Sequence, residues 1–410
     1  MADFLVLGAG MVGVSTALAL QEQGLSVTLV DRKAAGRETS FGNAGIIQAE
    51  AAEPYALPRD PITLLRLALG GTNDVTWSLS GVAEMLPALW QYYRNSSPAR
   101  HAKISHTYVR LTERSTHDHA PLIAEAGMEK LITRDGIAIL YRDPDEYAAA
   151  VIDAERVHAT YGTRFRAIDG AEYAREDPAL LKAPAGVVHW QDSWSCASPG
   201  ALTAGYADLF VRRGGTLLTG DAATLRQRGA GWQVETEAGA VDATQAVIAL
   251  GPWSPRLLAR LGYRIPMIYK RGYHGHFAAP RAPVRPFLDV AHGIVASPMT
   301  DGLRLATGAA LVSKDSAADL RQLDRGRAGI SDLIEIGARK DEPQWSGARP
   351  CLPDMLPLVG EAPRHKGLWM NFGHGHQGFT LGPTTGTLLA QMVAGHPNEG
   401  FEALLPSHRM

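Results

Sequence analysis

The 410-residue sequence has few cysteines, no excess of charge of one sign and no long apolar segment. Its two cysteines, Cys196 and Cys351, exclude a disulfide framework, a Cys-x-x-Cys motif and a cysteine-based zinc site. The 40 Lys and Arg residues nearly balance the 42 Asp and Glu residues and are dispersed, which argues against a nucleic-acid-binding face. No run of about 18 apolar residues is present, so no membrane-spanning helix is predicted.

The residues that are present are typical of a globular protein with more than one domain. Hydrophobic residues make up 45% and charged residues 20%, and the chain is too long for one typical core. It starts directly on a buried-type strand, which leaves no room for a cleavable signal, so we expect a cytoplasmic location. Residues 61–69 are amphipathic with a single Arg. We expect a helix packed on the core; the alternative is a peripheral helix touching the inner-membrane surface.

A strand, a glycine-rich turn, a helix and a second strand ending in an acid occupy residues 4–31. Gly8 allows the tight turn, Gly10 lets a pyrophosphate approach the backbone, and Gly13 lets the helix pack close to the sheet. The helix N-terminus faces the phosphates with free N–H groups. Asp31 stands where a carboxylate accepts hydrogen bonds from both ribose hydroxyls. The pattern predicts dinucleotide binding, and a turn that merely packs is the alternative.

Hydrophobic periodicity gives a coarse map of the remaining elements. Residues 78–127 are expected to be helical with interruptions at Pro87 and Pro98. Further helices are predicted over residues 145–161, 202–213, 316–339 and 384–393. Strands are predicted over residues 136–141, 214–218, 232–236, 246–250, 269–277, 293–297 and 303–307. We therefore expect an α/β fold, with a discontinuous Rossmann-like domain and an α+β part that holds a mixed or antiparallel sheet.

Three further segments turn dinucleotide binding into a flavin hypothesis. Residues 249–254 end a buried strand at a glycine, which allows the backbone to approach a neighbouring group closely. Residues 345–354 place Arg349 between two backbone-restricted points. Residues 371–383 lead into the last helix and aim backbone N–H groups at an anionic or electron-rich ring edge.

With the N-terminal pattern, these segments resemble the flavin-dependent D-amino-acid oxidase and dehydrogenase superfamily, and most closely the bacterial D-amino-acid dehydrogenase small-subunit type. Residues 39–45 resemble that branch's flavin-contacting loop, and residues 270–273 its substrate-domain strand. Residues 347–350 resemble its carboxylate-binding turn, and residues 373–380 its flavin-embracing C-terminal loop. The resemblance is sharp in these four clusters and diffuse over residues 51–190.

The resemblance implies noncovalent FAD and a large mixed sheet that covers the flavin. It implies an FAD-binding domain over residues 1–85, 196–262 and 341–410, and a substrate domain over residues 86–195 and 263–340. The residues expected to contact FAD are Gly8, Ala9, Gly10, Met11, Val12, Gly13, Asp31, Arg32, Ser40, Asn43, Ala44, Gly45, Ile46, Ala222, Leu250, Gly251, Trp253, Gly375, Gln377, Gly378, Phe379 and Thr380.

Arg349 is the main candidate for substrate binding, because a guanidinium grips an α-carboxylate with two parallel hydrogen bonds. The alternative is a buried arginine that bonds carbonyls of the Pro-rich loop. Glycine-oxidising relatives carry a second arginine in the C-terminal loop, where this sequence has His376. This difference argues against assigning their substrate to this protein. A protonated His376 or a backbone dipole there would stabilise reduced flavin; a loop histidine bonded to carbonyls is the alternative.

Two tyrosines and two histidine triplets complete the candidates. Tyr269 and Tyr273 share one face of a strand, so either is a candidate hydrogen-bond partner of the substrate, with a core or rim role as the alternative. The His-Gly-His triplets at residues 274–276 and 374–376 invite a metal interpretation. No carboxylate or cysteine stands at ligand spacing beside them, so no metal site is predicted.

The resemblance implies an FAD-dependent amino-acid dehydrogenase that oxidises the C–N bond of a small or cyclic D-amino acid, with a D-proline-like amine as one candidate. The α-carbon would give a hydride to flavin N5, and the electrons would pass to a quinone or a partner protein. One alternative is a sarcosine- or glycine-type oxidase, which needs a cation near the flavin; Lys270 is the candidate, with its orientation open. Others are a non-catalytic flavoprotein subunit and a NAD(P)-dependent reductase, for which a second dinucleotide fingerprint is missing. The oligomeric state is open.

Overall fold

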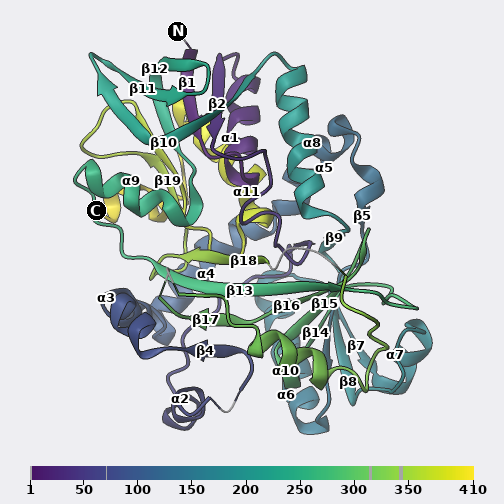
Figure 1. Ribbon diagram of the computed structural model, residues 1–410. Helices are drawn as coiled ribbons and strands as arrows, with labels where there is room; N and C mark the ends of the chain where they lie inside the picture. Colours follow the sequence, from purple (N-terminus) through teal and green to yellow (C-terminus); the bar gives the residue numbers. More distant parts are fainter. Residues whose placement is uncertain (1, 71, 314–315, 341–344) are drawn as a thin grey trace.

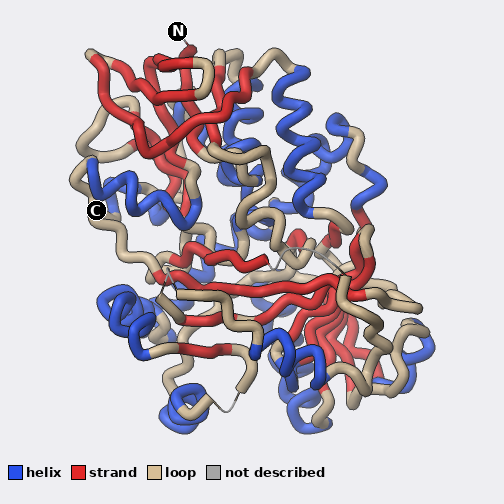
Figure 2. The backbone as a smooth tube through the Cα atoms, viewed as in Figure 1, coloured by secondary structure: helices blue, strands red, loops and turns tan. Residues whose placement is uncertain are grey.

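The computed structural model describes residues 2–70, 72–313, 316–340 and 345–410. Its elements form two parts, each built on one large sheet, and the long strand β13 lies along the boundary between them (Figure 1). The helices cover the outer faces of both sheets (Figure 2). The structure therefore has the mixed α/β architecture expected from the sequence.

The first sheet contains the N-terminal fingerprint. Its strands are β1 (Ala2–Leu7), β2 (Val27–Asp31), β10 (Thr216–Arg228), β11 (Gly231–Thr236), β12 (Gly239–Ile248), β19 (Leu358–Glu361) and β20 (Leu368–Phe372). Strand β1 pairs in parallel with β2 and β12, and β12 pairs in parallel with β20. Strands far apart in the chain thus meet in one sheet, which makes this part discontinuous.

Two helices from opposite ends of the chain pack closely on that sheet. Helix α1 (Met11–Glu22) follows the fingerprint turn, and helix α11 (Gly378–Val393) lies beside it. A Cβ atom added to Gly386 would lie 2.9 Å from the backbone of Ser15, so only glycine permits this approach. The contact brings the C-terminal loop to the start of α1.

The second sheet is mixed and mostly antiparallel. Its strands are β4 (Val75–Trp77), β17 (Ala309–Leu311), β13 (Ile268–Phe277), β16 (Gly302–Thr307), β15 (Ile294–Met299), β14 (Phe287–Asp289), β6 (Ile137–Tyr141), β8 (Gly186–Trp190), β7 (Phe165–Asp169) and β18 (Trp345–Cys351). Strand β18 pairs with β13 and places Arg349 opposite Lys270. A small third sheet joins β3 (Ile46–Ile47), β9 (Trp194–Cys196) and β5 (Ile132–Thr133).

The remaining helices are α2 (Pro61–Ala68), α3 (Leu79–Asn95), α4 (Pro98–Thr112), α5 (Ser115–Ala126), α6 (Pro144–Tyr161), α7 (Gly170–Glu176), α8 (Pro199–Arg212), α9 (Ser254–Arg260) and α10 (Arg321–Gly329). Strands β4 and β18 lie in the second sheet, although the sequence-derived ranges 1–85 and 341–410 assign them to the FAD-binding domain. We therefore propose that both segments be counted with the substrate domain.

Two predicted helices differ from the structure. The helix predicted over residues 316–339 is wrong, because α10 ends at Gly329, where a Cβ atom would lie 2.1 Å from the His292 ring. The last helix begins at Gly378 and not at residue 384, so part of the expected flavin loop is already helical. The helix tolerates Pro383 because the His119 side chain bonds the Phe379 carbonyl, which this proline leaves without an N–H donor.

Helix α2 is also not packed on the core as predicted. None of its residues is buried, and Ile62 and Leu65 are 64% and 59% exposed. Its other face, with Leu64 and Leu67, lines a cavity. The helix therefore covers an open space. In the described part of the chain, no helix is both long and apolar enough to cross a bilayer.

Candidate active site and cofactor-binding cleft

A cavity of about 1670 Å³ is lined by residues from both large sheets. Most residues expected to contact FAD line it: Gly8, Gly10, Met11, Val12, Asp31, Arg32, Ser40, Asn43, Ala44, Ile46, Ala222, Leu250, Gly251, Trp253, Gly375, Gly378 and Phe379. The remaining expected contacts do not line it: Ala9, Gly13, Gly45, Gln377 and Thr380. Arg349, Tyr273 and His376 also line the cavity.

The glycine-rich turn has the close backbone packing that its sequence requires. Gly8 has a φ of +109°, and a Cβ atom on Gly13 would lie 1.7 Å from the Gly8 carbonyl oxygen. Gly10, the N-cap of α1, provides no capping side chain, and Ser40 Oγ accepts from the Met11 N–H at 3.0 Å. The positive end of α1 opens on the cavity and has no capping side chain from its own N-cap residue, which fits a pyrophosphate.

Asp31 lies at the end of β2 and lines the same end of the cavity. Its Oδ2 accepts from the Ala9 N–H at 2.6 Å, and its Oδ1 accepts from the Lys33 N–H at 3.1 Å. The carboxylate is thus held in place beside the turn and keeps lone pairs for ribose hydroxyls. Nearby, the Arg32 guanidinium stacks 4.6 Å above the Trp253 ring.

Replacing Asp31 by Ala is expected to weaken FAD binding while the fold persists. Hydrogen bonds to a charged group contribute about 1.5–3 kcal/mol each, so the dissociation constant should rise at least about tenfold. Flavin fluorescence on titration of the apoprotein measures it. Lys33→Ala is the matched control, because it keeps the backbone N–H that donates to Asp31. An unchanged affinity in Asp31→Ala would show that the acid is only a strand end.

The loop of residues 39–45 is held against the second sheet. Arg304, on β16, donates to the carbonyl oxygens of Phe41 and Asn43, and its Nε lies 2.8 Å from His276 Nε2. His274 stacks on Trp345 with ring centroids 4.7 Å apart. The first His-Gly-His triplet thus fixes this loop. No group of three possible metal ligands occurs among the residues described.

His119, on α5, supports the start of α11 and was not found from the sequence. Pro383 has no N–H, so the Phe379 carbonyl lacks its usual helical donor. His119 Nε2 lies 3.1 Å from the Phe379 oxygen and 3.2 Å from the Thr380 oxygen. Because both are acceptors, Nε2 carries the proton, and Nδ1 accepts from the Tyr206 hydroxyl at 2.9 Å. His119 therefore fixes the turn that brings Phe379 to the cavity.

Two histidines of the C-terminal loop are neutral. Burial, together with the smaller effect of the charges of Arg349 and Lys270, lowers the pKa of His376 to about 3. Burial alone lowers the pKa of His374 to about 3, and its Nε2 lies 3.0 Å from Thr385 Oγ1. The expectation of a protonated His376 is therefore wrong at neutral pH. The backbone dipoles at the start of α11 and the charges of Arg349 and Lys270 are the sources of positive potential beside this loop.

These buried histidines predict acid sensitivity. Burial also lowers the pKa of His119 to about 4. Each ring stays neutral in the fold but is protonated near pH 6.5 in the unfolded chain. The free energy of unfolding is therefore highest above pH 6.5. It falls as the pH is lowered, by about 2 kcal/mol per histidine at pH 5.

Urea unfolding of the apoprotein at pH 7.5 and pH 5 measures this loss. His374→Gln should make the difference between the two pH values smaller. The exposed His117, replaced in the same way, serves as the control and should leave it unchanged. Equal pH dependence in all three proteins would contradict the assignment.

The substrate end of the cavity contains two neighbouring cations. Arg349 donates to the carbonyl oxygens of Gly308 at 2.7 Å and Thr307 at 2.9 Å. Lys270 Nζ donates to the Tyr92 hydroxyl at 3.0 Å. Burial disfavours the charged form of Lys270, but Cys351 and Tyr92 together raise its pKa, so it is a cation at neutral pH. The Lys270 side chain lines the cavity. The sequence had left its orientation open.

The two candidate tyrosines are separated. Tyr273 is 2% exposed and lines the cavity. Tyr269 does not line it, because this end of β13 packs against α3, where the Tyr269 N–H donates to Met85 Sδ at 3.1 Å. The structure therefore assigns Tyr269 the packing role that was its alternative.

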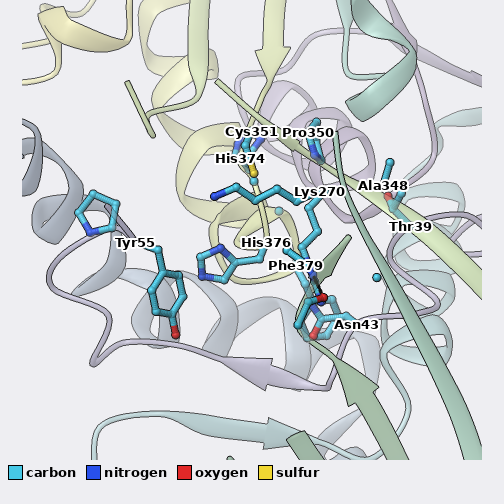
Figure 3. Close-up of a pocket in the computed structure, with 18 of the residues that line it drawn as sticks. Thr39, Asn43, Tyr55, Lys270, Ala348, Pro350, Cys351, His374, His376 and Phe379 are labelled. Carbon is cyan, nitrogen blue, oxygen red and sulfur yellow. Dashed lines mark hydrogen bonds between the residues drawn. The ribbon is translucent and has the colours of Figure 1, made fainter. Parts of the chain in front are cut away.

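Sequence reasoning also missed Glu50 and Tyr55, which follow β3 and line the cavity. Figure 3 shows Tyr55, His376 and Lys270 in the same part of it, and the Tyr55 and His376 ring centroids lie 5.1 Å apart. Desolvation raises the pKa of the Tyr55 hydroxyl, Glu50 raises it further, and Arg349 and Lys270 lower it. Charges of both signs therefore lie within electrostatic reach of this hydroxyl.

Comparison with known proteins agrees with this geometry. A D-amino acid dehydrogenase of Chromohalobacter salexigens is 31% identical over 414 residues, which cover 95% of each chain. One of Cereibacter sphaeroides is 32% identical over 96% of this chain and 92% of its own.

Solved structures share the fold. A glycine oxidase from Geobacillus kaustophilus superposes with a TM-score of 0.72 and 21% identity, covering 97% of this chain and 96% of its own. The L-proline dehydrogenase of P. horikoshii gives 0.69 and 16%, covering 100% and 97%. The family model described as DAO, FAD dependent oxidoreductase, matches residues 3–392. The chain therefore belongs to this family of FAD-dependent oxidoreductases, and its cofactor is FAD.

Proposed function

We propose that the protein is a D-amino-acid dehydrogenase that binds its substrate by the α-carboxylate and passes electrons to a quinone or a partner protein. The observation that carries this proposal is the pairing of Lys270 with Arg349 across strands β13 and β18, with both side chains on the cavity that the FAD fingerprint also lines. Among the described residues, no carboxylate forms an ion pair with either cation. A substrate carboxylate would supply the missing charge.

The contacts of Arg349 support the leading role that we propose for it. Two of its five N–H groups bond the carbonyls of Thr307 and Gly308, which fixes the guanidinium plane. The others remain for two-point binding of a carboxylate, which orients the α-carbon. FAD, bound noncovalently, supplies the hydride acceptor. The neutral His376 and the Tyr273 side chain border this space without adding charge.

The relatives that are 31% and 32% identical are D-amino acid dehydrogenases, and this supports the choice of a D-amino acid. A small or cyclic amino acid such as D-proline is the substrate we propose. The test is a screen of D-, L- and N-methyl amino acids with the purified FAD-loaded protein, in air and with a dye acceptor. Activity with L-amino acids alone, or with none of the panel, would reject the proposal.

One observation favours an oxidase as the second candidate. Lys270 points into the cavity as a cation, and positive charge beside a flavin assists oxygen reduction. The substrate-reduced protein should be mixed separately with oxygen and with a quinone analogue. We expect fast reoxidation by the quinone only. Reoxidation by oxygen as fast as turnover would replace the dehydrogenase assignment with the oxidase.

A further inference from the structure

Glu50 is a carboxylate on the cavity wall that the roles assigned so far do not use. It follows β3, and its Oε1 accepts from Gln48 Nε2 at 2.9 Å. Its Oε2 accepts from the Ser193 hydroxyl, whose own oxygen accepts from the Ala49 N–H at 3.1 Å. Two neutral donors thus fix the carboxylate and leave its other lone pairs unoccupied.

A second glutamate, three residues later, shows what Glu50 lacks. Glu53 also lines the cavity, but both its oxygens lie 2.9 Å from guanidinium nitrogens of Arg156, and its Oε1 accepts from the Tyr161 hydroxyl. Within the described part of the chain, no cation forms an ion pair with Glu50. Glu50 is partly buried, and a charge that is partly removed from water without a partner is costly, so a cationic ligand group at Glu50 would be favoured.

We propose that Glu50 binds the amino group of the substrate and accepts the proton that its ammonium form must lose before oxidation. This inference rests on the proposed function. The charges on the cavity wall support it. The cations Arg349 and Lys270 complement the carboxylate of an amino acid, and the Glu50 carboxylate complements its ammonium group. Glu50 lines the same cavity as Arg349, Lys270 and Tyr55, so one bound amino acid has groups of both signs on the walls around it.

The proton step balances without another reactant. An N–H bond of the ammonium breaks, an O–H bond forms on Glu50, and the electron pair stays on nitrogen. That pair forms the C=N bond when the hydride leaves the α-carbon for FAD, and Glu50 later releases its proton to water. A substrate already carrying a neutral amine would not need Glu50.

The surroundings of Glu50 suit a proton acceptor. Burial raises the pKa of its carboxyl, the hydrogen bonds from Ser193 and Gln48 oppose this, and the charge of Asp192 adds to it. Asp192 is itself paired with Arg164 at 2.6 Å. Among the described residues, Glu50 also acts on the Tyr55 and Tyr108 hydroxyls, and desolvation raises the pKa of both, so neither adds charge.

The test compares Glu50→Gln with the matched control Glu53→Gln. Both are loaded with FAD and reduced anaerobically by D-proline and D-alanine in a stopped-flow instrument from pH 6 to pH 10. General bases contribute about 10²–10⁴-fold, so Glu50→Gln should be at least about 100-fold slower at pH 7. Its rate should rise about tenfold per pH unit toward the pKa of the free amine, because only the neutral amine then reacts. Glu53→Gln should keep the wild-type profile.

A second readout separates chemistry from structure. Binding of propionate, a carboxylate without an amine, is followed by the change in flavin absorbance and should be equal in the wild type and Glu50→Gln. An unchanged pH profile, or a loss equal at every pH with weaker propionate binding, would overturn the role of Glu50 alone. Failure of both amino acids to reduce the wild type would overturn the proposed function, and the Glu50 assignment with it.

Discussion

Arg349→Lys is expected to lower kcat/KM for an amino acid by at least about tenfold while the protein retains FAD. Arg349 uses two N–H groups for the carbonyls of Thr307 and Gly308 and has others for a carboxylate. Lysine has three donors on one nitrogen and cannot serve both pairs in one plane. A tenfold loss corresponds to about 1.4 kcal/mol of transition-state stabilisation. Steady-state kinetics with a dye acceptor measure it.

The decarboxylated amine of the same substrate provides the control. It has no carboxylate for Arg349 to bind, so the substitution should change its slow turnover little. Equal losses for the amino acid and the amine would show that Arg349 only supports the carbonyls, which is the alternative role that the sequence left open. Flavin absorbance before each assay confirms that both proteins are equally loaded.

His119→Leu is expected to destabilise the protein by about 1–3 kcal/mol. It leaves the Phe379 carbonyl, which has no N–H donor at Pro383, without its hydrogen bond in a buried region, and it leaves the Tyr206 hydroxyl only the backbone carbonyl of residue 119 at 3.3 Å. Each buried unsatisfied group costs about 1–3 kcal/mol, and some of this cost is relieved by relaxation. Urea unfolding of the apoprotein at pH 7.5 measures the change.

A second substitution identifies the cause. Pro383→Ala restores the N–H that a helix donates to the Phe379 carbonyl. It should therefore stabilise the His119→Leu protein more than it stabilises the wild type, by about 1 kcal/mol or more in a double-mutant cycle. Additive effects would show that His119 stabilises the fold by packing and not through this carbonyl.

The contrast between these residues shows what the sequence could predict. The fingerprint turn was predictable because its glycines, helix and acid are local in sequence and their spacing follows from backbone geometry. His119 gave no signal, since its role depends on a proline 264 positions away (383 − 119). Lys270 and Arg349 were noted separately, but only the register of β13 against β18 places them side by side.

The packing of α2 and the setting of Glu50 were not predicted from the sequence, also for physical reasons. Helix α2 has the amphipathic pattern of a packed helix, but the space under its apolar face is a cavity. Glu50 lies in a stretch without a motif, and Glu53 in the same stretch is neutralised by Arg156. Composition does not distinguish a carboxylate with a cation from one without, because the partner comes from a distant helix.

The central claim is that this chain holds an amino acid by its carboxylate so that its α-carbon reduces FAD. The most direct measurement is the bleaching of flavin absorbance when the loaded protein is mixed anaerobically with one D-amino acid, its L-enantiomer and its decarboxylated amine. We expect rapid bleaching with the D-amino acid and at least about tenfold slower reduction by the other two, corresponding to about 1.4 kcal/mol or more. Equal rates with the amino acid and the amine, or reduction by neither enantiomer, would contradict it.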